Sequence, residues 1–249
     1  MYIVGRKPVI EAIELGVPIH EILVYHGSAK SLKNEILSAQ SKGIKVTRCE
    51  KHVLEKIAGS ATHQGIAAET EEPLFVGVED IVEIGLKEGR GGLVLILDEI
   101  QDPQNVGAII RSALAAGVNG VVITKKHSSP PITPATIKAS AAAVLKMPIA
   151  VESNIALAIE KLKNLRYVIY GADAKEGQPY YNAEFNGNVA IVMGGEASGM
   201  RKLTKQKCDF IVHIPMKSEM DSLNVSAAGA VILFEIARKQ AKNAEKSRK

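Results

Sequence analysis

Six short apolar runs in the second half of the chain most constrain its fold, because they are continuous rather than alternating. They fall at residues 93–97, 120–124, 147–151, 166–172, 188–193 and 209–215. A strand that is apolar along its whole length must be covered on both faces, which is typical of a parallel sheet. Helical patterns lie between most of these runs and after the last one, at 104–116, 133–144, 154–163 and 224–239. This alternation predicts a doubly wound α/β domain of about 150 residues.

The N-terminal part of the chain predicts a second, smaller α/β domain. After an extended start and a short amphipathic helix, the strand-like segments "HEILVYHG", "IKVTRCE" and "HQGIAAET" alternate with the helical segments "SLKNEILSAQSKG" and "KHVLEKIAG". A stretch rich in charges and Gly then follows, which predicts a linker with one short helix. We therefore expect a small domain at 1–72, a linker at 73–91, a large domain at 92–240 and a basic tail at 241–249.

Composition excludes several classes of protein. Aromatic residues make up only 4% of the chain and Trp is absent, which disfavours an RNA-binding surface built from several stacked aromatics. The two Cys lie far apart without a CxxC pattern, and the six His are scattered, so we expect no metal site. No apolar run approaches the roughly eighteen residues of a membrane span, and the N-terminus lacks a signal-peptide core. A cytoplasmic protein is expected, and its net charge of +4 permits an acidic partner.

The first candidate site segment is "DPQNVGAIIRSA", which follows the first apolar run of the large domain. Asp102 as a cap and Pro103 in the first turn predict the start of a helix. Asn105 then lies near the helix N-terminus and Arg111 about one and a half turns further on, on a different face. We expect the long Arg111 side chain to fold back toward the helix start; an ordinary surface arginine is the alternative.

The second candidate segment is "NVAIVMGGEASGM", in which a buried strand ends at Gly194-Gly195-Glu196. Glycine at the carboxyl end of a strand lets the backbone approach a ligand closely. The segment has neither a P-loop ending nor a GxGxxG pattern, and Glu196 would repel a phosphate. It therefore favours a neutral or cationic ligand, or one that donates hydrogen bonds, with a glycine turn and a solvated Glu as the alternative.

The third candidate segment, "SLNVSAAGAVILFEIAR", opens a helix whose body is apolar all round, which predicts deep burial. Ser222 and Asn224 stand at its start, where capping is the simplest role, but one helix does not need both as caps. The polar residues of all three segments fall in the first, fifth and sixth strand units, several of them at strand carboxyl ends. Ligands bind at that edge in open α/β sheets. The absence of a dinucleotide fingerprint after the first strand disfavours an oxidoreductase.

Together these segments resemble a known family. "DPQNVGAIIRSA", "GGEASGM" followed by "CDFIVHIPM", and "SLNVSAA" resemble, in order and spacing, the three motifs of the SpoU/TrmH family of RNA ribose 2′-O-methyltransferases, within the SPOUT class. "GRKPVIEAI" and "HQGIAAE" look like the ribosomal-protein-type substrate-binding domain of the subgroup that methylates a large-subunit (23S) rRNA guanosine. Two departures are Met200, where Leu is commoner, and "SAAAV" (140–144), where Ser-Ala-Gly-Ala is commoner.

The resemblance implies an α/β-knot fold, in which the carboxyl part of the large domain forms a deep trefoil knot, one of the rare exceptions to unknotted chains. It implies a homodimer with the knots at the interface. It also implies S-adenosylmethionine as the methyl donor, bound in the knot. The expected cofactor-binding residues are Gly194, Gly195, Ile214, Met216 and Leu223.

The resemblance further implies methyl transfer to a ribose 2′-hydroxyl, with Arg111 as the family's proposed base. A guanidinium has a pKa above about 12, so holding the adjacent phosphate is physically easier for Arg111 than losing a proton. Asn105 would orient Arg111 or the ribose, and Glu196 would help to position the loop and Arg111. The expected catalytic residues are Asn105, Arg111, Glu196, Ser222 and Asn224.

RNA contacts are expected from the small domain, which would recognise an RNA loop by its shape and backbone. The candidate residues are Gly5, Arg6 and Lys7, with Arg48 and His63 as weaker candidates. The basic tail is either a solvated, frayed helix end or a further RNA contact. Two other functions stay open: a tRNA ribose methyltransferase of the same family, and a non-catalytic RNA-binding or ribosome-assembly protein.

Overall fold

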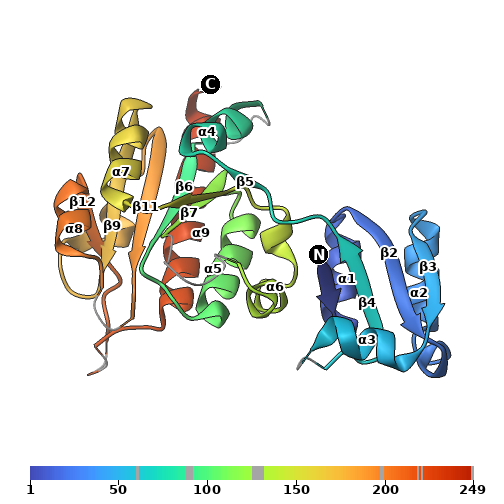
Figure 1. Cartoon of the computed structure of the whole chain (residues 1–249). Helices are drawn as coiled ribbons and strands as arrows, with labels where there is room; N and C mark the ends of the chain where they lie inside the picture. The colour runs from blue at the N-terminus through green and yellow to red at the C-terminus, as the bar shows by residue number, and fades with distance from the viewer. Residues whose placement is uncertain are drawn as a thin grey trace.

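The computed structural model describes residues 1–59, 62–87, 92–124, 132–196, 199–217, 219 and 221–247. Within these residues the chain forms two sheets, each with its own helices, and an extended segment joins them (Figure 1). Parts of the predicted linker (88–91), of the Gly-Gly-Glu loop (197–198) and of the tail (248–249) lie outside the described residues.

The small sheet has four strands in the order β1-β4-β2-β3. Strand β4 pairs antiparallel with β1 and β2, and β2 pairs parallel with β3. Its elements are β1 (Tyr2–Val4), α1 (Arg6–Leu15), β2 (Ile19–Tyr25), α2 (Lys33–Ser41), β3 (Lys45–Cys49), α3 (Lys51–Ala58) and β4 (Ile66–Thr70). These elements confirm the alternation predicted from the sequence.

The large sheet has eight strands in the order β10-β12-β9-β11-β6-β7-β8-β5, and every pair in it is parallel. This confirms the mostly parallel α/β sheet predicted from the continuous apolar runs. Its strands are β5 (Phe75–Val76), β6 (Leu93–Asp98), β7 (Gly120–Thr124), β8 (Ile149–Glu152), β9 (Tyr167–Asp173), β10 (Gln178–Pro179), β11 (Asn188–Gly194) and β12 (Phe210–His213).

Helices cover both faces of the large sheet, because successive residues of a strand point to opposite sides. Leu93, Leu95 and Leu97 of β6 pack into the core that contains α5 and α9, whereas Val94 and Ile96 pack into the core that contains α4 and α7. The helices of this domain are α4 (Val78–Lys87), α5 (Pro103–Ala115), α6 (Pro134–Ala139), α7 (Ile155–Asn164), α8 (Lys202–Lys207) and α9 (Val225–Ser247). The arrangement brings the carboxyl ends of β6, β9, β11 and β12 to one edge (Figure 1).

The helix predicted at 133–144 is shorter in the structure. It ends at Ala139, and a 3-10 turn over Ala143–Leu145 follows. Between them Ala141 and Ala142 take positive φ angles of 53° and 62°, a left-handed conformation that costs a non-glycine residue about 1–2 kcal/mol. Ser140 stabilises the break, since its hydroxyl donates to Ile137 O at 3.0 Å and accepts from the Val144 amide at 3.3 Å.

Helix α9 continues to Ser247, so most of the predicted tail is helical, in line with the expected helix end. The expectation that this helix is buried all round is wrong, because Val231 and Phe234 are 38% and 50% exposed while Ile232, Leu233 and Ile236 are buried. An apolar stripe of α9 therefore faces outward from the single chain. Strands β5 and β10 and helix α8 are further elements that the apolar pattern did not predict.

Candidate active site

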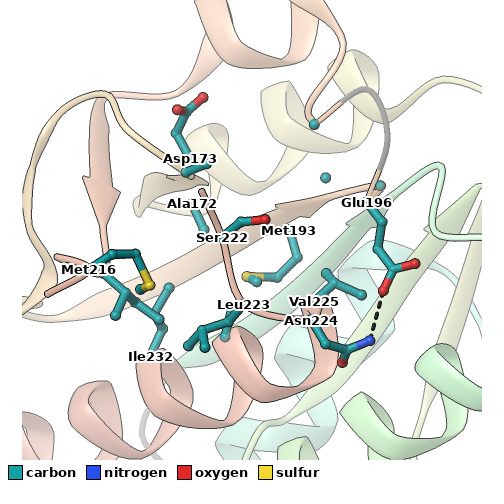
Figure 2. Close-up of a pocket in the computed structure, with 16 residues that line it drawn as sticks. Ala172, Asp173, Met193, Glu196, Met216, Ser222, Leu223, Asn224, Val225 and Ile232 are labelled. Atoms are coloured by element: carbon teal, nitrogen blue, oxygen red, sulfur yellow. Dashed lines mark hydrogen bonds between the residues drawn. The ribbon is translucent and has the colours of Figure 1, made fainter. Parts of the chain in front are cut away.

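A cavity of about 420 Å³ opens at the carboxyl ends of β9, β11 and β12, beside the start of α9 (Figure 2). This is the edge at which open α/β sheets bind ligands. Its volume falls within the roughly 300–1,000 Å³ typical of small-molecule sites. The predicted residues that line it are the cofactor residues Gly194, Gly195, Ile214, Met216 and Leu223, together with Glu196, Ser222 and Asn224.

Three of the predicted catalytic residues form one hydrogen-bonded cluster at this cavity. Asn105 Nδ2 donates to Glu196 Oε1 at 3.0 Å, and Asn224 Nδ2 donates to the same oxygen at 2.7 Å. Asn224 Nδ2 also donates to Asn105 Oδ1 at 2.9 Å. The structure does not show Asn105 in contact with Arg111, one of its two expected roles, because both amides instead hold the Glu196 carboxylate. Figure 2 shows the bond from Asn224 to Glu196 beside the cavity.

Helix capping places both amides. Asp102 caps α5, since its carboxylate accepts the backbone N–H groups of Gln104 and Asn105 at 3.3 and 3.2 Å. Asn224 caps α9 through its Oδ1, which accepts the backbone N–H groups of Ser226 and Ala227. The capping role that the sequence allowed for Asn224 is confirmed, and its Nδ2 remains directed to Glu196. Ser222 lines the cavity instead.

Glycine is required where β11 ends. A Cβ on Gly194 would collide with the backbone of Gly199 and Met200, so a side chain there would push the returning loop away. Gly195 and Gly199 are joined by two backbone hydrogen bonds of 3.2 and 2.8 Å, and Gly199 has a φ of +63°. The loop therefore closes tightly on itself, which keeps Glu196 at the mouth of the cavity.

The sequence reasoning missed an ion pair behind this loop. Asp98, at the carboxyl end of β6, is fully buried. The Asp98 carboxylate accepts the backbone N–H of Arg201 at 3.0 Å and the side-chain Nε–H of Arg201 at 2.8 Å. Arg201 Nη2 also lies 2.7 Å from Asp98 Oδ1. The pair ties the end of β6 to the residue after the Gly194–Met200 loop. A charged residue directly after the run "LVLIL" was the signal that could have indicated it.

A second missed carboxylate, Asp173, lines the cavity from the end of β9. Burial alone would raise the pKa of Asp173, but the backbone N–H groups of Lys175 and Glu176 and the Lys205 ammonium outweigh it. The result is a pKa lowered to about 2. Lys205 Nζ lies 2.7 Å from Asp173 Oδ2. Asp173 is therefore ionised at neutral pH and forms an ion pair with Lys205 at this side of the cavity.

Arg111 does not reach this cluster, and the expectation that its side chain folds back toward the helix start is wrong for the single chain. Its guanidinium instead faces the small domain, with Nη2 3.7 Å from Glu11 Oε1. Asn105 and Arg111 lie on different faces of α5, as their spacing predicted. The Arg111 side chain does not reach back along the helix to Asn105.

The predicted RNA-contacting residues lie together at the start of α1. Gly5 precedes the helix with a φ of +102°. Arg6 is held by the nearly buried Glu35 through two contacts of 2.8 Å. Lys7 is 81% exposed, with the Glu11 carboxylate 4.0 Å away. The weaker candidate Arg48 is exposed on β3.

Within the described part of the chain, no group of three His, Cys, Asp or Glu side chains could hold a metal ion. Both cysteines are free thiols. Burial raises the pKa of the Cys208 thiol to about 12, so it stays protonated and is a poor nucleophile. No helix among the described residues is long and apolar enough to cross a membrane.

Comparison with known families agrees with this arrangement. The model of the SpoU rRNA methylase family matches residues 92–234. The chain belongs to this family. A second family, described as the substrate-binding domain of RNA 2′-O ribose methyltransferases, matches residues 2–76. In this SpoU family member, Asn105 and Asn224 both donate to the Glu196 carboxylate beside the cavity, whereas Arg111 lies beside Glu11.

Two relatives are similar along nearly their whole length. The 23S rRNA (guanosine-2′-O-)-methyltransferase RlmB of Xanthomonas axonopodis pv. citri is 39% identical over 243 residues, with 96% of each chain covered. A TrmH-family protein of Staphylococcus aureus, whose name leaves tRNA and rRNA open as substrates, is 39% identical over 240 residues and 96% of each chain.

Among solved structures, the SpoU methyltransferase AviRb of Streptomyces viridochromogenes, in complex with the cofactor AdoMet, superposes with a TM-score of 0.73. The two are 21% identical, and 97% of this chain and 91% of AviRb are covered. The likeness shows that the chain has the SpoU methyltransferase fold, for which the resemblance predicts the trefoil knot.

Proposed function

We propose that this protein transfers a methyl group from S-adenosylmethionine to the ribose 2′-hydroxyl of a guanosine in 23S rRNA, in the cytoplasm. The observation that carries the proposal is the Asn105–Glu196–Asn224 cluster at the mouth of a cavity lined by all five expected cofactor residues. The substrate follows from the RlmB relative and from the substrate-binding family at residues 2–76.

The cavity residues fit S-adenosylmethionine in size and chemistry. Ile214, Leu223 and Ile232 supply apolar walls for a ring, and the Gly194 backbone permits close approach. The Glu196 and Asp173 carboxylates suit a ligand with a sulfonium and an ammonium group. When bound, S-adenosylmethionine supplies an activated methyl group. The protein must then hold the ribose oxygen in line with the bond between the methyl group and sulfur, so that a C–O bond would form as the C–S bond breaks, S-adenosylhomocysteine would leave, and the hydroxyl proton would pass to water.

Each proposed catalytic residue has a role in that task. Glu196 accepts hydrogen bonds from the Asn105 and Asn224 amides, and these bonds would fix the loop after β11. Asn105 and Asn224 keep its carboxylate in one orientation, and Ser222 offers a hydroxyl to the ligand from the cavity wall. Arg111 binds the phosphate next to the target ribose, which favours the ionised hydroxyl without requiring a neutral guanidinium.

A homodimer through the large domain accounts for the position of Arg111. The guanidinium does not reach the cavity of its own chain, so Arg111 of a second copy would complete each site. The outward stripe of α9 supports this arrangement, because Val231 and Phe234 are 38% and 50% exposed, and Leu223, just before the helix, is 37% exposed and also lines the cavity. Exposed apolar surface of this kind is typical of a protein–protein contact.

The proposal is tested by incubating the purified protein with methyl-labelled S-adenosylmethionine and unmodified transcripts of 23S rRNA and of tRNA. Label on a ribose of the rRNA alone is the expected result. Label on tRNA would replace the proposed substrate by a tRNA. A protein that binds the cofactor yet labels neither RNA, nor an assembly-stage ribosomal particle, would contradict the proposal and favour a non-catalytic RNA-binding protein.

A further inference from the structure

A second cavity, of about 440 Å³, lies where the small domain meets the large one. Its walls come from α1 through Glu11 and Glu14, from α5 through Arg111 and Leu114, and from the Ser140 segment. The only cationic side chain among its lining residues in the described part of the chain is that of Arg111. Arg111, the residue proposed to bind an RNA phosphate, therefore lies between the two domains.

Glu11 and Arg111 form a loose ion pair across this cavity. Their closest charged atoms, Oε1 and Nη2, are 3.7 Å apart, beyond ordinary hydrogen-bond length. The Glu11 side chain is only 16% exposed, whereas Arg111 is 57% exposed. Lys7, one helical turn before Glu11 on α1, is a second cation near this carboxylate, at 4.0 Å. The guanidinium is therefore attracted to Glu11 but retains room to move.

Other contacts hold Glu11 at this place. Lys146 Nζ, from the large domain, donates to the Leu15 carbonyl at the end of α1 at 2.7 Å. Strand β1 of the small domain also contacts α6 of the large one. Since α1 is fixed against the large domain at its end, the Glu11 carboxylate is presented to Arg111 without depending on their loose ion pair.

We propose that Glu11 is a positioning residue that holds Arg111 in a resting state and releases it when RNA arrives. The inference rests on the proposed role of Arg111 as a phosphate ligand. Carboxylate and phosphate oxygens offer a guanidinium the same kind of acceptor, so the two compete for Arg111. RNA that binds Lys7 brings its phosphates to the same helix, where they compete with Glu11 for the Arg111 guanidinium. Recognition by the small domain is thereby coupled to the release of Arg111.

The test compares Glu11→Gln with Glu14→Gln, a matched control from the same helix and the same cavity. Affinity for a 23S rRNA transcript is measured by direct binding, and KM and kcat by methyl transfer. Exposed ion pairs contribute up to about 1 kcal/mol, so Glu11→Gln should bind RNA about two- to fivefold more tightly, with KM lowered equally and kcat unchanged. The gain should shrink in high salt and vanish in the Arg111→Ala background. Glu14→Gln should resemble the wild type.

Unchanged or weaker RNA binding by Glu11→Gln would overturn the inference. A merely structural role for Glu11 would lower the melting temperature and raise KM, the opposite of the expected shift. A gain of equal size in Glu14→Gln would also overturn it, because the effect would then be one of general charge. Methyl transfer by the wild-type protein that is lost in Arg111→Ala keeps the proposed function standing in each of these cases, whereas its absence in the wild type overturns both.

Discussion

The two ends of helix α5 hold polar side chains in contrasting ways. At the N-terminal end, Asn105 is 9% exposed and its amide is fixed by Glu196 and Asn224 at 2.9–3.0 Å. One and a half turns later, Arg111 is 57% exposed and only loosely paired with Glu11. The cavity end is therefore preorganised for a small ligand, and the junction end is free to meet a large one. The contrast teaches that one helix can hold one polar side chain rigidly and leave another loosely paired, and under the proposed function these two side chains would serve the cofactor site and the RNA.

The two ion pairs near these parts of α5 differ in the same way, one being buried and tight and the other exposed and loose. Asp98 is buried and makes three contacts of 2.7–3.0 Å with Arg201. The Glu11–Arg111 pair is longer and largely solvated on one side. Salt screens solvated pairs much more than buried ones, so ionic strength should alter the junction end and spare the cavity end.

The largest expected effect is that of Arg111→Ala on catalysis. Methyl transfer should fall by at least about a hundredfold, since positioned groups that assist proton removal contribute about 10²–10⁴. Cofactor affinity should stay largely intact, because the proposed ligand of Arg111 is an RNA phosphate rather than the cofactor. Calorimetric titration with S-adenosylmethionine beside a transfer assay separates the two. Loss of both together would indicate a structural role for Arg111.

The second prediction concerns stability at the cavity end. Asp98→Asn should lower the free energy of unfolding by about 2–3 kcal/mol, somewhat less than for a fully buried pair, because Arg201 is 38% exposed. Glu99→Gln is the matched control, since Glu99 is 41% exposed and 3.5 Å from Arg201, and should cost less than about 1 kcal/mol. Denaturant unfolding measures both. Equal losses would show that burial does not distinguish the two carboxylates.

A third prediction uses the depressed pKa of Asp173. A folded-state pKa of about 2, against 3.8 in the unfolded chain, contributes about 2 kcal/mol of stability above pH 4. That contribution should be lost as the pH falls from about 4 to about 2. In Asp173→Asn the difference from the wild type should therefore shrink toward pH 2, as measured by unfolding at a series of pH values. Asp221→Asn, at an exposed ion pair with Lys175, should change stability far less.

The smallest effects should distinguish two basic neighbours on α1. Lys7→Ala should weaken RNA binding a few-fold and lower the salt dependence of affinity by about one ion, without changing stability. Arg6→Ala should lower stability instead, because it leaves the nearly buried Glu35 without its cation. Binding at several salt concentrations and thermal unfolding of both variants provide the test. Equal losses of RNA affinity would contradict a purely structural Arg6.

Much of the cavity could be predicted from the sequence, because its residues depend on strand ends and helix starts. The continuous apolar runs indicate the parallel strands, and parallel strands bring Gly194 and Ile214 to one edge. The start of α5 was readable from Asp102 and Pro103, which correctly placed Asn105 near it. Residue patterns of this kind are local, so they are visible without knowing the tertiary contacts.

The remaining features depend on contacts between distant segments. Arg111 meets Glu11 only because the two domains pack together, and no periodicity within α5 indicates that neighbour. Asp98 and Arg201 are 103 positions apart, and their pairing requires the loop after β11 to return beside β6. The break at Ala141 and Ala142 was missed because alanine favours helix and rarely takes a positive φ.

The most direct test of the central claim is complementation between two inactive variants, Arg111→Ala and Asn224→Ala. If each site combines Asn224 of one copy with Arg111 of another, mixed dimers hold one intact site, and statistical mixing restores roughly a quarter of wild-type activity. Activity is measured after the two purified variants are unfolded and refolded together, with each variant refolded alone as the control. Recovery on mixing is the predicted result. No recovery, with mixed dimers present, would show that Arg111 acts within its own chain or not at all.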